Sequence, residues 1–258
     1  MLSCNNYQGF IFDLDGVVWR GKDAVPGGSE VINFLREHGK KIAFLTNNAG
    51  EHHRSQHRKL LSMGVEANLD EVITAGSAAA LYIKEHHGSS RIFVMGTDDL
   101  KQEMIDAGHL SVDINAQFVV VGFDRGFNYE KLNQAYQNII KGAKFIACNQ
   151  NPLYPTEHGL KPGVGPSVQA LACCSGKTPD IVIGKPHRPI VDITLSRLGL
   201  KAKECLVVGD MLDFDIQAGI SAGTDTLYVL SGIGKKEDIE TLGITPNHIL
   251  NSIAEMEL

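Results

Sequence analysis

The chain contains little cysteine, and its cysteines follow no familiar spacing. Only five occur among 258 residues, and no two are spaced as Cys-x-x-Cys. An odd and irregular set fits neither a disulfide framework nor a zinc ribbon, and it indicates a reducing compartment. We expect each one to behave as a small buried hydrophobic residue. The five are Cys4, Cys148, Cys173, Cys174 and Cys205.

Long apolar runs and basic blocks are missing as well. No stretch of 18 apolar residues occurs, and the first strand-like run begins near residue 9, which leaves no room for a signal peptide before it. The net charge is −6, without a basic block or stripe, which disfavours nucleic acid and anionic membranes as partners. We therefore expect a cytoplasmic protein with neither kind of partner. The sequence leaves open whether it forms a homo-oligomer.

Four short motifs occur in order along the chain, each joined to an apolar run. They are FIFDLDG at residues 10–16, FLTNN at 44–48, IVIGKP at 181–186 and LVVGDMLDFD at 206–215. Short apolar runs bounded by turn residues are typical of strands buried on both faces of a parallel sheet. In open α/β sheets, the residues just beyond the carboxyl ends of such strands share one crevice. We expect the following side chains to meet there: Asp13, Asp15, Thr46, Asn47, Lys185, Asp210 and Asp215.

These residue types suit phosphoryl transfer. A carboxylate such as Asp13 can attack phosphorus and form an aspartyl-phosphate, which divides one difficult step into two. The attack brings two anions together, and Mg²⁺, which prefers carboxylates, water and phosphate oxygens, is the cation that fits. We expect Asp13 and Asp210 to bind Mg²⁺ through their side chains and Asp15 through its backbone carbonyl. Asp215 is expected to hold metal-bound water from outside the first ligand shell.

The remaining polar residues have expected roles around the phosphoryl group. The Asp15 side chain, two residues beyond the nucleophile, can protonate the leaving alcohol and later activate water. Thr46 and Asn47 are expected to donate hydrogen bonds to phosphoryl oxygens, and Asn48 is expected to take part in substrate binding. Lys185 is expected to add positive charge where negative charge concentrates.

The four motifs together resemble those of the haloacid dehalogenase superfamily of hydrolases. Three further stretches make the chain similar to the NagD or 4-nitrophenylphosphatase branch: DGVVWRG at 15–21, TNN at 46–48, and VVVGFDR at 119–125 running on to FIACN at 145–149. The resemblance implies an α/β fold, with a Rossmann-like, doubly wound parallel-sheet core and an inserted α/β cap domain. It also implies a Mg²⁺-dependent phosphatase that hydrolyses small-molecule phosphate monoesters.

Strand and helix signals alternate along the chain, as a βαβ fold requires. Core strands are predicted at residues 9–14, 41–46, 71–75, 180–184, 204–209 and 225–230. The segment between the second and third motifs has its own strands, at 91–95, 118–122 and 144–147, and its own helices, at 98–107 and 129–141. That is too much regular structure for a loop. We therefore assign residues 1–78 and 181–258 to the core and 79–180 to the cap.

In the resembling family the cap supplies substrate contacts. We expect them here at Asp124 and Arg125, in residues 149–152, and in the turn at 161–165, although that turn also reads as a plain entry to a helix. Two departures from the family pattern stand out. Gln150 and Asn151 replace a proline and a carboxylate, and Phe214 replaces a threonine. Losing the carboxylate either favours a more anionic leaving group or is a neutral change.

The strongest local basic run is HHRSQHRK at residues 52–59. His53 and His57 are four residues apart and so share a helix face. No acidic or cysteine partner lies nearby in the sequence, and we therefore expect an exposed helix face and not a zinc site.

Three rival interpretations share parts of this pattern. A dehalogenase uses an aspartate nucleophile, but a halide leaves without protonation, so Asp15 would lack a purpose. A phosphosugar mutase or phosphotransferase keeps both aspartates and differs in what accepts the phosphoryl group. A non-catalytic phosphometabolite-binding protein would be free to lose Asp13 or Asp15. The sequence leaves the substrate open among sugar phosphates, nucleotides, glycerol or glycolate phosphates and pyridoxal phosphate.

Overall fold

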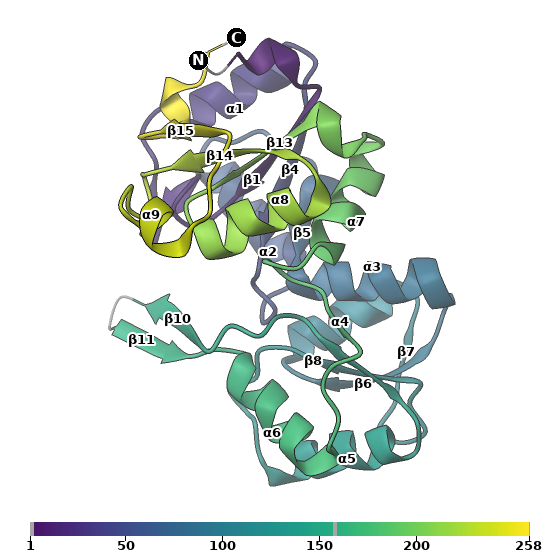
Figure 1. Ribbon diagram of the computed structural model, residues 1–258. Helices are drawn as coiled ribbons and strands as arrows, with labels where there is room; N and C mark the ends of the chain where they lie inside the picture. Colours follow the sequence, from purple (N-terminus) through teal and green to yellow (C-terminus); the bar gives the residue numbers. More distant parts are fainter. Residues whose placement is uncertain (1–2, 157–158, 258) are drawn as a thin grey trace. The chain divides into compact units, whose positions relative to one another are not determined.

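The computed structural model describes residues 3–156 and 159–257, and it divides into two compact units, each with its own parallel sheet (Figure 1). The first unit comprises Met1–Thr46, Arg54–Ile73 and Lys185–Leu258. The second comprises Asn47–His53 and Thr74–Gly184. Each unit is described by itself below.

The first unit contains a six-stranded sheet in the order β15-β14-β13-β1-β4-β5. The strands are β1 (Gly9–Asp13), β4 (Lys41–Thr46), β5 (Val72–Thr74), β13 (Cys205–Gly209), β14 (Asp225–Val229) and β15 (His248–Leu250). The pairs from β15 through to β4 are parallel. A short hairpin of β2 (Trp19–Arg20) and β3 (Asp23–Ala24) follows β1. The central strands are buried along their length, which explains why they read as nearly continuous apolar runs.

Helices cover both faces of this sheet. Successive side chains of a strand point to opposite faces. Phe10 and Phe12 of β1 pack in one cluster with residues of α1 (Gly28–Glu37) and α2 (His53–Ser62). On the other face lie α7 (Pro189–Leu198) and α8 (Gln217–Ala222). Thr194 of α7 lines a small cavity together with Ala43 of β4, and Gly219 of α8 lies close to Val207 of β13. The last helix is α9 (Asp238–Leu242).

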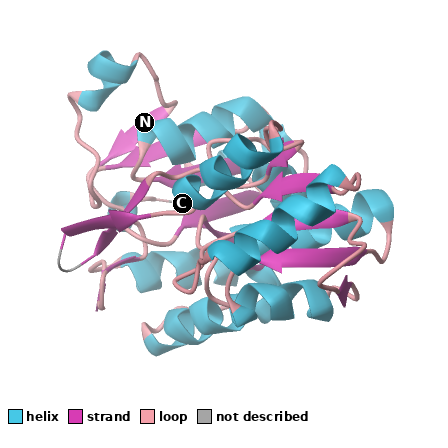
Figure 2. Ribbon diagram, turned by 90° about the horizontal axis from the view of Figure 1, so that it is seen from below, coloured by secondary structure: helices cyan, strands magenta, loops and turns pink. Residues whose placement is uncertain are grey.

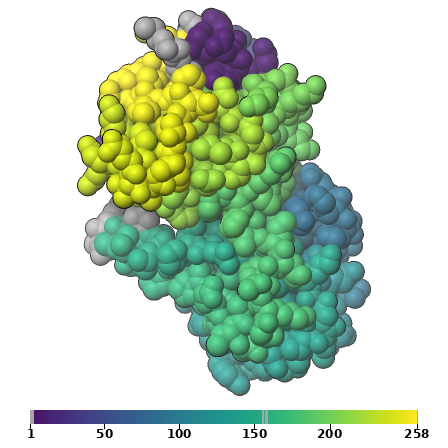
Figure 3. All heavy atoms as spheres, viewed as in Figure 1, coloured from purple at the N-terminus to yellow at the C-terminus, as the bar shows by residue number. Residues whose placement is uncertain are grey.

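The two ends of the described chain meet in the first unit. The backbone N–H of Cys4 donates to the carbonyl of Glu257 at 3.2 Å. The purple N-terminal and yellow C-terminal segments accordingly lie side by side in both the ribbon and the space-filling view (Figures 1 and 3).

The second unit has a five-stranded parallel sheet in the order β12-β9-β8-β6-β7. Its strands are β6 (Arg91–Met95), β7 (Leu110–Ser111), β8 (Phe118–Val121), β9 (Lys144–Ala147) and β12 (Ile181–Val182). Its helices are α3 (Ala75–His87), α4 (Asp98–Asp106), α5 (Tyr129–Ile140) and α6 (Gly165–Ser175). A hairpin of β10 (Leu153–Thr156) and β11 (Gly159–Pro162) completes it. Figure 2 shows the alternation of helices in cyan and strands in magenta.

One strand predicted for the core belongs to the other sheet. Residues 180–184 were expected beside the catalytic strands, but β12 pairs with β9, with Ile181 opposite Ile146. The N–H groups of Asp180 and Ile183 donate to carbonyls of Phe145 and Ala147. An apolar run alone does not specify which sheet edge satisfies its backbone, so the sequence could not distinguish the two.

The structure also bears on the cysteines and on membrane-spanning helices. Cys4, Cys148 and Cys205 are buried as predicted, but Cys173 and Cys174 are exposed on the last turns of α6, so the prediction is wrong for them. Among the described residues, no helix combines the length and the apolar character needed to cross a membrane.

Candidate active site

Strand register brings the first and last motifs together. Residues Phe12 of β1 and Val208 of β13 are paired neighbours in the parallel sheet. Asp13 and Asp210 therefore emerge at the same edge, where the carboxyl ends of the two strands meet. Asp210 is 3 % exposed and Asp215 2 %, and carboxylate oxygens of Asp13, Asp210 and Asp215 lie within 4.8 Å of one another.

Lys185 provides a positive charge to this group. Its ammonium nitrogen lies 2.5 Å from Oδ1 of Asp13 and 2.5 Å from Oδ1 of Asp215. The other oxygen of Asp215 accepts the N–H of Met211 at 3.0 Å. Asp215 lies in the π-helical turn Leu212–Ile216, and Met211 is the residue directly before that turn. Asp215 is thereby fixed from two sides, and it holds the lysine against Asp13.

Burial and crowding of charge shift the pKa values here. Burial raises the pKa of Asp13 well above its usual range, and Asp215 and Asp210 add to this against the opposing pull of Lys185. Burial, followed by the charge of Asp215, raises the pKa of Asp210 to about 7. Burial disfavours the ammonium of Lys185, but the carboxylates of Asp13 and Asp215 outweigh it and raise the pKa of the lysine.

The charge balance fits a divalent cation. Three ionised carboxylates against one ammonium leave two negative charges in a buried pocket, which is unfavourable. The donors are hard oxygens, which suit Mg²⁺. Asp13 and Asp210 could hold the ion through their side chains, together with the backbone carbonyl of Asp15.

Glycines leave the space that the Asp210 carboxylate occupies. A Cβ built on Gly16 or on Gly232 would run into this carboxylate, and Gly16 also has a φ of +85° that favours glycine. The N–H of Ile233 donates to Oδ2 of Asp210 at 2.9 Å, and the hydroxyl of Ser231 donates to the carbonyl of Gly16 at 2.7 Å. The loop after β14 therefore closes around Asp210, a contribution that the sequence analysis missed.

Asp15 differs from the other aspartates because its side chain is exposed. Its Oδ1 accepts a hydrogen bond of 2.8 Å from the indole N–H of Trp19, whose ring is fully buried. The ammonium of Lys59 lies 4.0 Å from the centre of that ring. The only tryptophan of the chain thus orients Asp15. In the sequence, the signal for this role of Trp19 is its position four residues after Asp15 in the motif DGVVWRG.

The second motif divides between the two units. Thr46 ends β4, is 6 % exposed and follows Leu45, the partner of Asp13, so it lies at the same sheet edge as Asp13. Asn47 and Asn48 belong to the second unit. Oδ1 of Asn48 accepts the N–H groups of Gly50 and Glu51 at 2.9 and 3.1 Å, so this side chain shapes its own loop.

Asn47 joins a group of asparagines within the second unit. Its amide nitrogen lies 3.4 Å from Oδ1 of Asn151, and the amide of Asn149 donates to its carbonyl at 2.8 Å. The Asn149 side chain also accepts the N–H of Asn151 at 3.1 Å. The absence of a side chain at Gly184 leaves room for Asn47 and Asn149.

The second unit carries a cavity of about 430 Å³. It is lined by Phe123, Asp124, Arg125, Phe127, Tyr154, Lys161, Pro162, Gly163, Pro166 and Ser167. Two of the three predicted cap contact regions, at 124–125 and 161–165, therefore contribute to one cavity, whereas residues 149–152 do not line it. Asp124 is held by Lys131 at 2.6 Å, so the charges that the lining offers to a ligand come from Arg125 and Lys161.

Comparisons with known proteins agree with this geometry. Residues 10–109 match a family model described as haloacid dehalogenase-like hydrolase, and residues 182–256 match a second one described as HAD-hydrolase-like. An acid sugar phosphatase of Staphylococcus epidermidis is 36% identical over 98% of this chain and 99% of that protein. The chain belongs to the haloacid dehalogenase-like hydrolases. The matches confirm the family resemblance and the α/β fold predicted from the sequence.

Other relatives of this haloacid dehalogenase-like hydrolase carry related names. The 5′-nucleotidase YutF of Bacillus subtilis is 34% identical over 96% of this chain and 97% of its own length. The solved structure of a p-nitrophenyl phosphatase from Archaeoglobus fulgidus superposes with a TM-score of 0.93 at 36% identity, covering 97% of this chain and 98% of that one. A structure titled as a putative NagD protein has a TM-score of 0.89 at 32% identity, covering 98% and 97%. The predicted enzyme class, a phosphoric monoester hydrolase, is confirmed by these relatives.

Proposed function

We propose that this hydrolase is a Mg²⁺-dependent phosphatase that acts on small-molecule phosphate monoesters through an aspartyl-phosphate on Asp13. The observation that carries the proposal is the contrast between two aspartates of one motif. Asp13 is buried against Lys185 among carboxylates, whereas Asp15 is exposed and oriented by Trp19. A nucleophile and a general acid need these two different environments.

The chain's own residues support each step. Asp13 attacks phosphorus, and Lys185, 2.5 Å from its oxygen, offsets the negative charge that gathers there. Asp15 donates a proton to the leaving oxygen and then takes one from the water that cleaves the acyl phosphate. Thr46 and Asn47 donate to phosphoryl oxygens, and Asn48 contributes to substrate binding in addition to its loop contacts.

Asp13, Asp210 and the carbonyl of Asp15 are the residues that would hold Mg²⁺, with Asp215 behind them. When bound, the ion supplies the positive charge that lets an anionic nucleophile approach an anionic phosphate. Asp215 keeps Lys185 in place through one oxygen and accepts the Met211 N–H through the other, and its negative charge near Asp13 and Asp210 would support the ion from outside the first ligand shell.

We further propose that the second unit is the substrate-selecting cap, corresponding to the inserted segment 79–180 expected from the sequence. Its cavity combines the cations Arg125 and Lys161 with the rings of Phe123 and Tyr154, which lie edge to face at 5.3 Å. Such a lining suits a leaving group that is polar or anionic and that also presents a flat or apolar face. Because relatives are named an acid sugar phosphatase and a 5′-nucleotidase, sugar phosphates and nucleoside monophosphates are the first substrates to test.

The test is phosphate release from p-nitrophenyl phosphate, sugar phosphates and nucleoside monophosphates, with Mg²⁺ and with a chelator. We expect metal-dependent release, and a hydroxylamine-sensitive phosphate on Asp13 in quenched samples analysed by mass spectrometry. Transfer to a phosphosugar in preference to water would favour a mutase. Binding without any turnover by the folded, Mg²⁺-loaded chain would favour a non-catalytic sensor.

The cavity has a separate test. Replacing Lys161 by Met should raise KM for the preferred substrate about tenfold or more while changing kcat for p-nitrophenyl phosphate little. Lys177→Met, at an exposed position of the same unit, is the matched control. Equal effects of the two substitutions would remove the cavity from substrate selection.

A further inference from the structure

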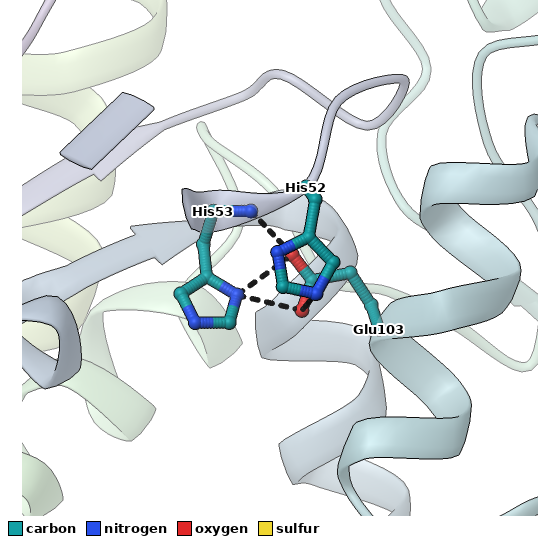
Figure 4. Close-up of side chains that lie close together, drawn as sticks. All are labelled: His52, His53 and Glu103. Carbon is teal, nitrogen blue, oxygen red and sulfur yellow. Dashed lines mark hydrogen bonds and ion pairs between the residues drawn. The ribbon is translucent and has the colours of Figure 1, made fainter. Parts of the chain in front are cut away.

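Two adjacent histidines of the second unit face one buried carboxylate far from them in the sequence. Nδ1 of His53 lies 2.9 and 2.8 Å from the two oxygens of Glu103, and Nε2 of His52 lies 3.8 Å from Oε2 (Figure 4). Their rings stack with centres 4.4 Å apart. His52 and His53 lie at the start of α2, and Glu103 comes from α4, so the fold creates this cluster.

The cluster is enclosed and acidic on one side. Glu103 is 3 % exposed and His52 6 %, so the exposed helix face expected from the run at 52–59 is wrong for His52, whereas Arg54 and Arg58 are exposed. Oδ2 of Asp106 lies 3.3 Å from Nε2 of His52, and Oδ2 of Asp99 accepts the His52 N–H at 3.1 Å. Buried carboxylates need a cation or hydrogen-bond donors, and an imidazole carries a charge only when it is protonated.

We propose that His52, His53 and Glu103 form a site for a borderline first-row divalent ion, specifically Zn²⁺, separate from the oxygen-rich catalytic group. One ligand atom from each residue lies within 4.8 Å of the other two, as the ligands of one ion must. Two imidazoles and one carboxylate match a known zinc ligand set, which leaves one position for water or for Asp106. Nitrogen ligands suit Zn²⁺ and are poor ligands for Mg²⁺.

Existing contacts already orient two of the ligands. Oε1 of Glu103 accepts the backbone N–H of His53 at 2.6 Å, which leaves Oε2 directed at the two rings. Gln102 donates to Oδ1 of Asp106 at 2.6 Å and so helps to hold this candidate fourth ligand. Contacts of this kind behind the ligands are typical of metal sites.

The protons on His53 and Glu103 can also be accounted for when the ion binds. His53 Nδ1 and a Glu103 oxygen are at hydrogen-bond distance, so one of the two carries a proton between them. Zn²⁺ binds neutral imidazole and carboxylate, so a neutral His53 ring that gives Nδ1 to the ion keeps its single proton on Nε2, and no net loss of a proton is required.

The experiment is a titration of the chelator-treated full chain with Co²⁺, a spectroscopic substitute for Zn²⁺, in excess Mg²⁺ to saturate the oxygen site. We expect one equivalent of Co²⁺ with visible absorption bands of low coordination number, displaced by Zn²⁺. His53→Gln and His52→Gln should each weaken binding at least about tenfold. His57→Gln is the matched control, because His57 lies on the same helix and contacts the carbonyl of Ala67 at 2.8 Å.

Several results would overturn the proposal. Absence of a stoichiometric Co²⁺ signal in the folded wild-type chain is one of them. Equal binding by wild type and both cluster variants would place the ion elsewhere. If one variant fails to fold, as judged by circular dichroism, the other decides, together with Glu103→Gln, which retains an acceptor for the His53 N–H. Activity is not the readout, so the outcome is independent of the phosphatase assay.

Discussion

The ammonium of Lys185 lies 2.5 Å from the carboxylate of Asp13 in a pocket where both side chains are almost completely buried. The lysine follows directly after the second unit in the chain, and the aspartate ends the first strand of the first unit. Lys185 pairs with the carboxylates of Asp13 and Asp215, and a carboxylate oxygen of Asp210 lies within 4.8 Å of theirs.

Replacing Lys185 by Met should destabilise the metal-free protein strongly. Breaking a buried ion pair costs about 3–5 kcal/mol, because the remaining charge stays buried without its partner. We expect the free energy of unfolding in urea, measured with a chelator, to fall by an amount in this range, and Mg²⁺ to restore part of it. Turnover should fall at least about 100-fold. Unchanged stability and kinetics would remove Lys185 from both roles, and Lys177→Met serves as the exposed control.

Replacing Asp13 by Asn should abolish turnover without unfolding the chain. The amide keeps the shape of the side chain but lacks the charge that attacks phosphorus, so kcat should fall by about 10³-fold or more. The circular dichroism spectrum should not change. Asp192→Asn, in an exposed ion pair with Arg188, is the control and should retain full activity. Normal turnover by a folded Asp13→Asn protein would disprove its assignment as nucleophile.

Much of the fold and the gathering of the site could be predicted, because both follow from local pattern. A buried run such as residues 10–14 specifies a parallel strand, and the polar residues at its end must then lie at the sheet edge. The positions of Asp13 and Asp210 follow from this rule alone. The helices predicted to begin at residues 98 and 129 also begin there, at Asp98 and Tyr129.

What could not be predicted depends on contacts between distant residues. The pairing of Ile181 with β9 depends on which sheet edge has free backbone groups, and the apolar run at 181–183 does not determine that edge. Glu103 is 50 residues from His53, so a search for nearby acidic partners missed it. The role of Trp19 required the turn after β1, where its indole folds back onto Asp15.

The hydrogen bond from Trp19 to Asp15 predicts an effect that depends on the leaving group. Asp15→Asn should slow hydrolysis of an alkyl phosphate by about 10²–10⁴-fold, because general acid catalysis is lost. The loss with p-nitrophenyl phosphate should be smaller, since its leaving group needs little protonation. Trp19→Phe, which removes the N–H donor together with part of the buried ring, should show the same ordering at about tenfold. Equal losses with both substrates would indicate that the indole acts only in packing.

His109 predicts a pH dependence of stability. Its Nδ1 accepts the N–H of Ser90 at 3.2 Å and its Nε2–H donates to the carbonyl of Ala80 at 2.9 Å, so the neutral ring satisfies both contacts. Burial lowers the pKa of His109; the hydrogen bond to the Ala80 carbonyl opposes this shift, and the charge of Lys84 adds a smaller lowering effect. The unfolded chain therefore binds this proton at a higher pH than the folded chain does.

The stabilisation from His109 is thus present above the unfolded pKa of about 6.5 and is lost as pH falls below it. Between about pH 7.5 and about pH 5, the free energy of unfolding should fall more in wild type than in His109→Gln. Urea unfolding at both pH values measures the difference. His38→Gln, at an exposed position, should keep the wild-type slope, and a parallel slope in His109→Gln would exclude the histidine as the source.

The space at Gly232 predicts a defect confined to metal binding. A Cβ at this position would overlap the Asp210 carboxylate, which is held by the N–H of Ile233 at 2.9 Å. Gly232→Ala should displace that carboxylate and raise the Mg²⁺ concentration for half-maximal activity about tenfold or more. Saturating Mg²⁺ should recover much of kcat, because Asp13 and Lys185 are not displaced. Ile233→Ala removes a side chain that is 61 % exposed and should leave the Mg²⁺ requirement unchanged. A lower kcat at saturating Mg²⁺ with no change in the Mg²⁺ requirement would show that the loop after β14 acts on another step.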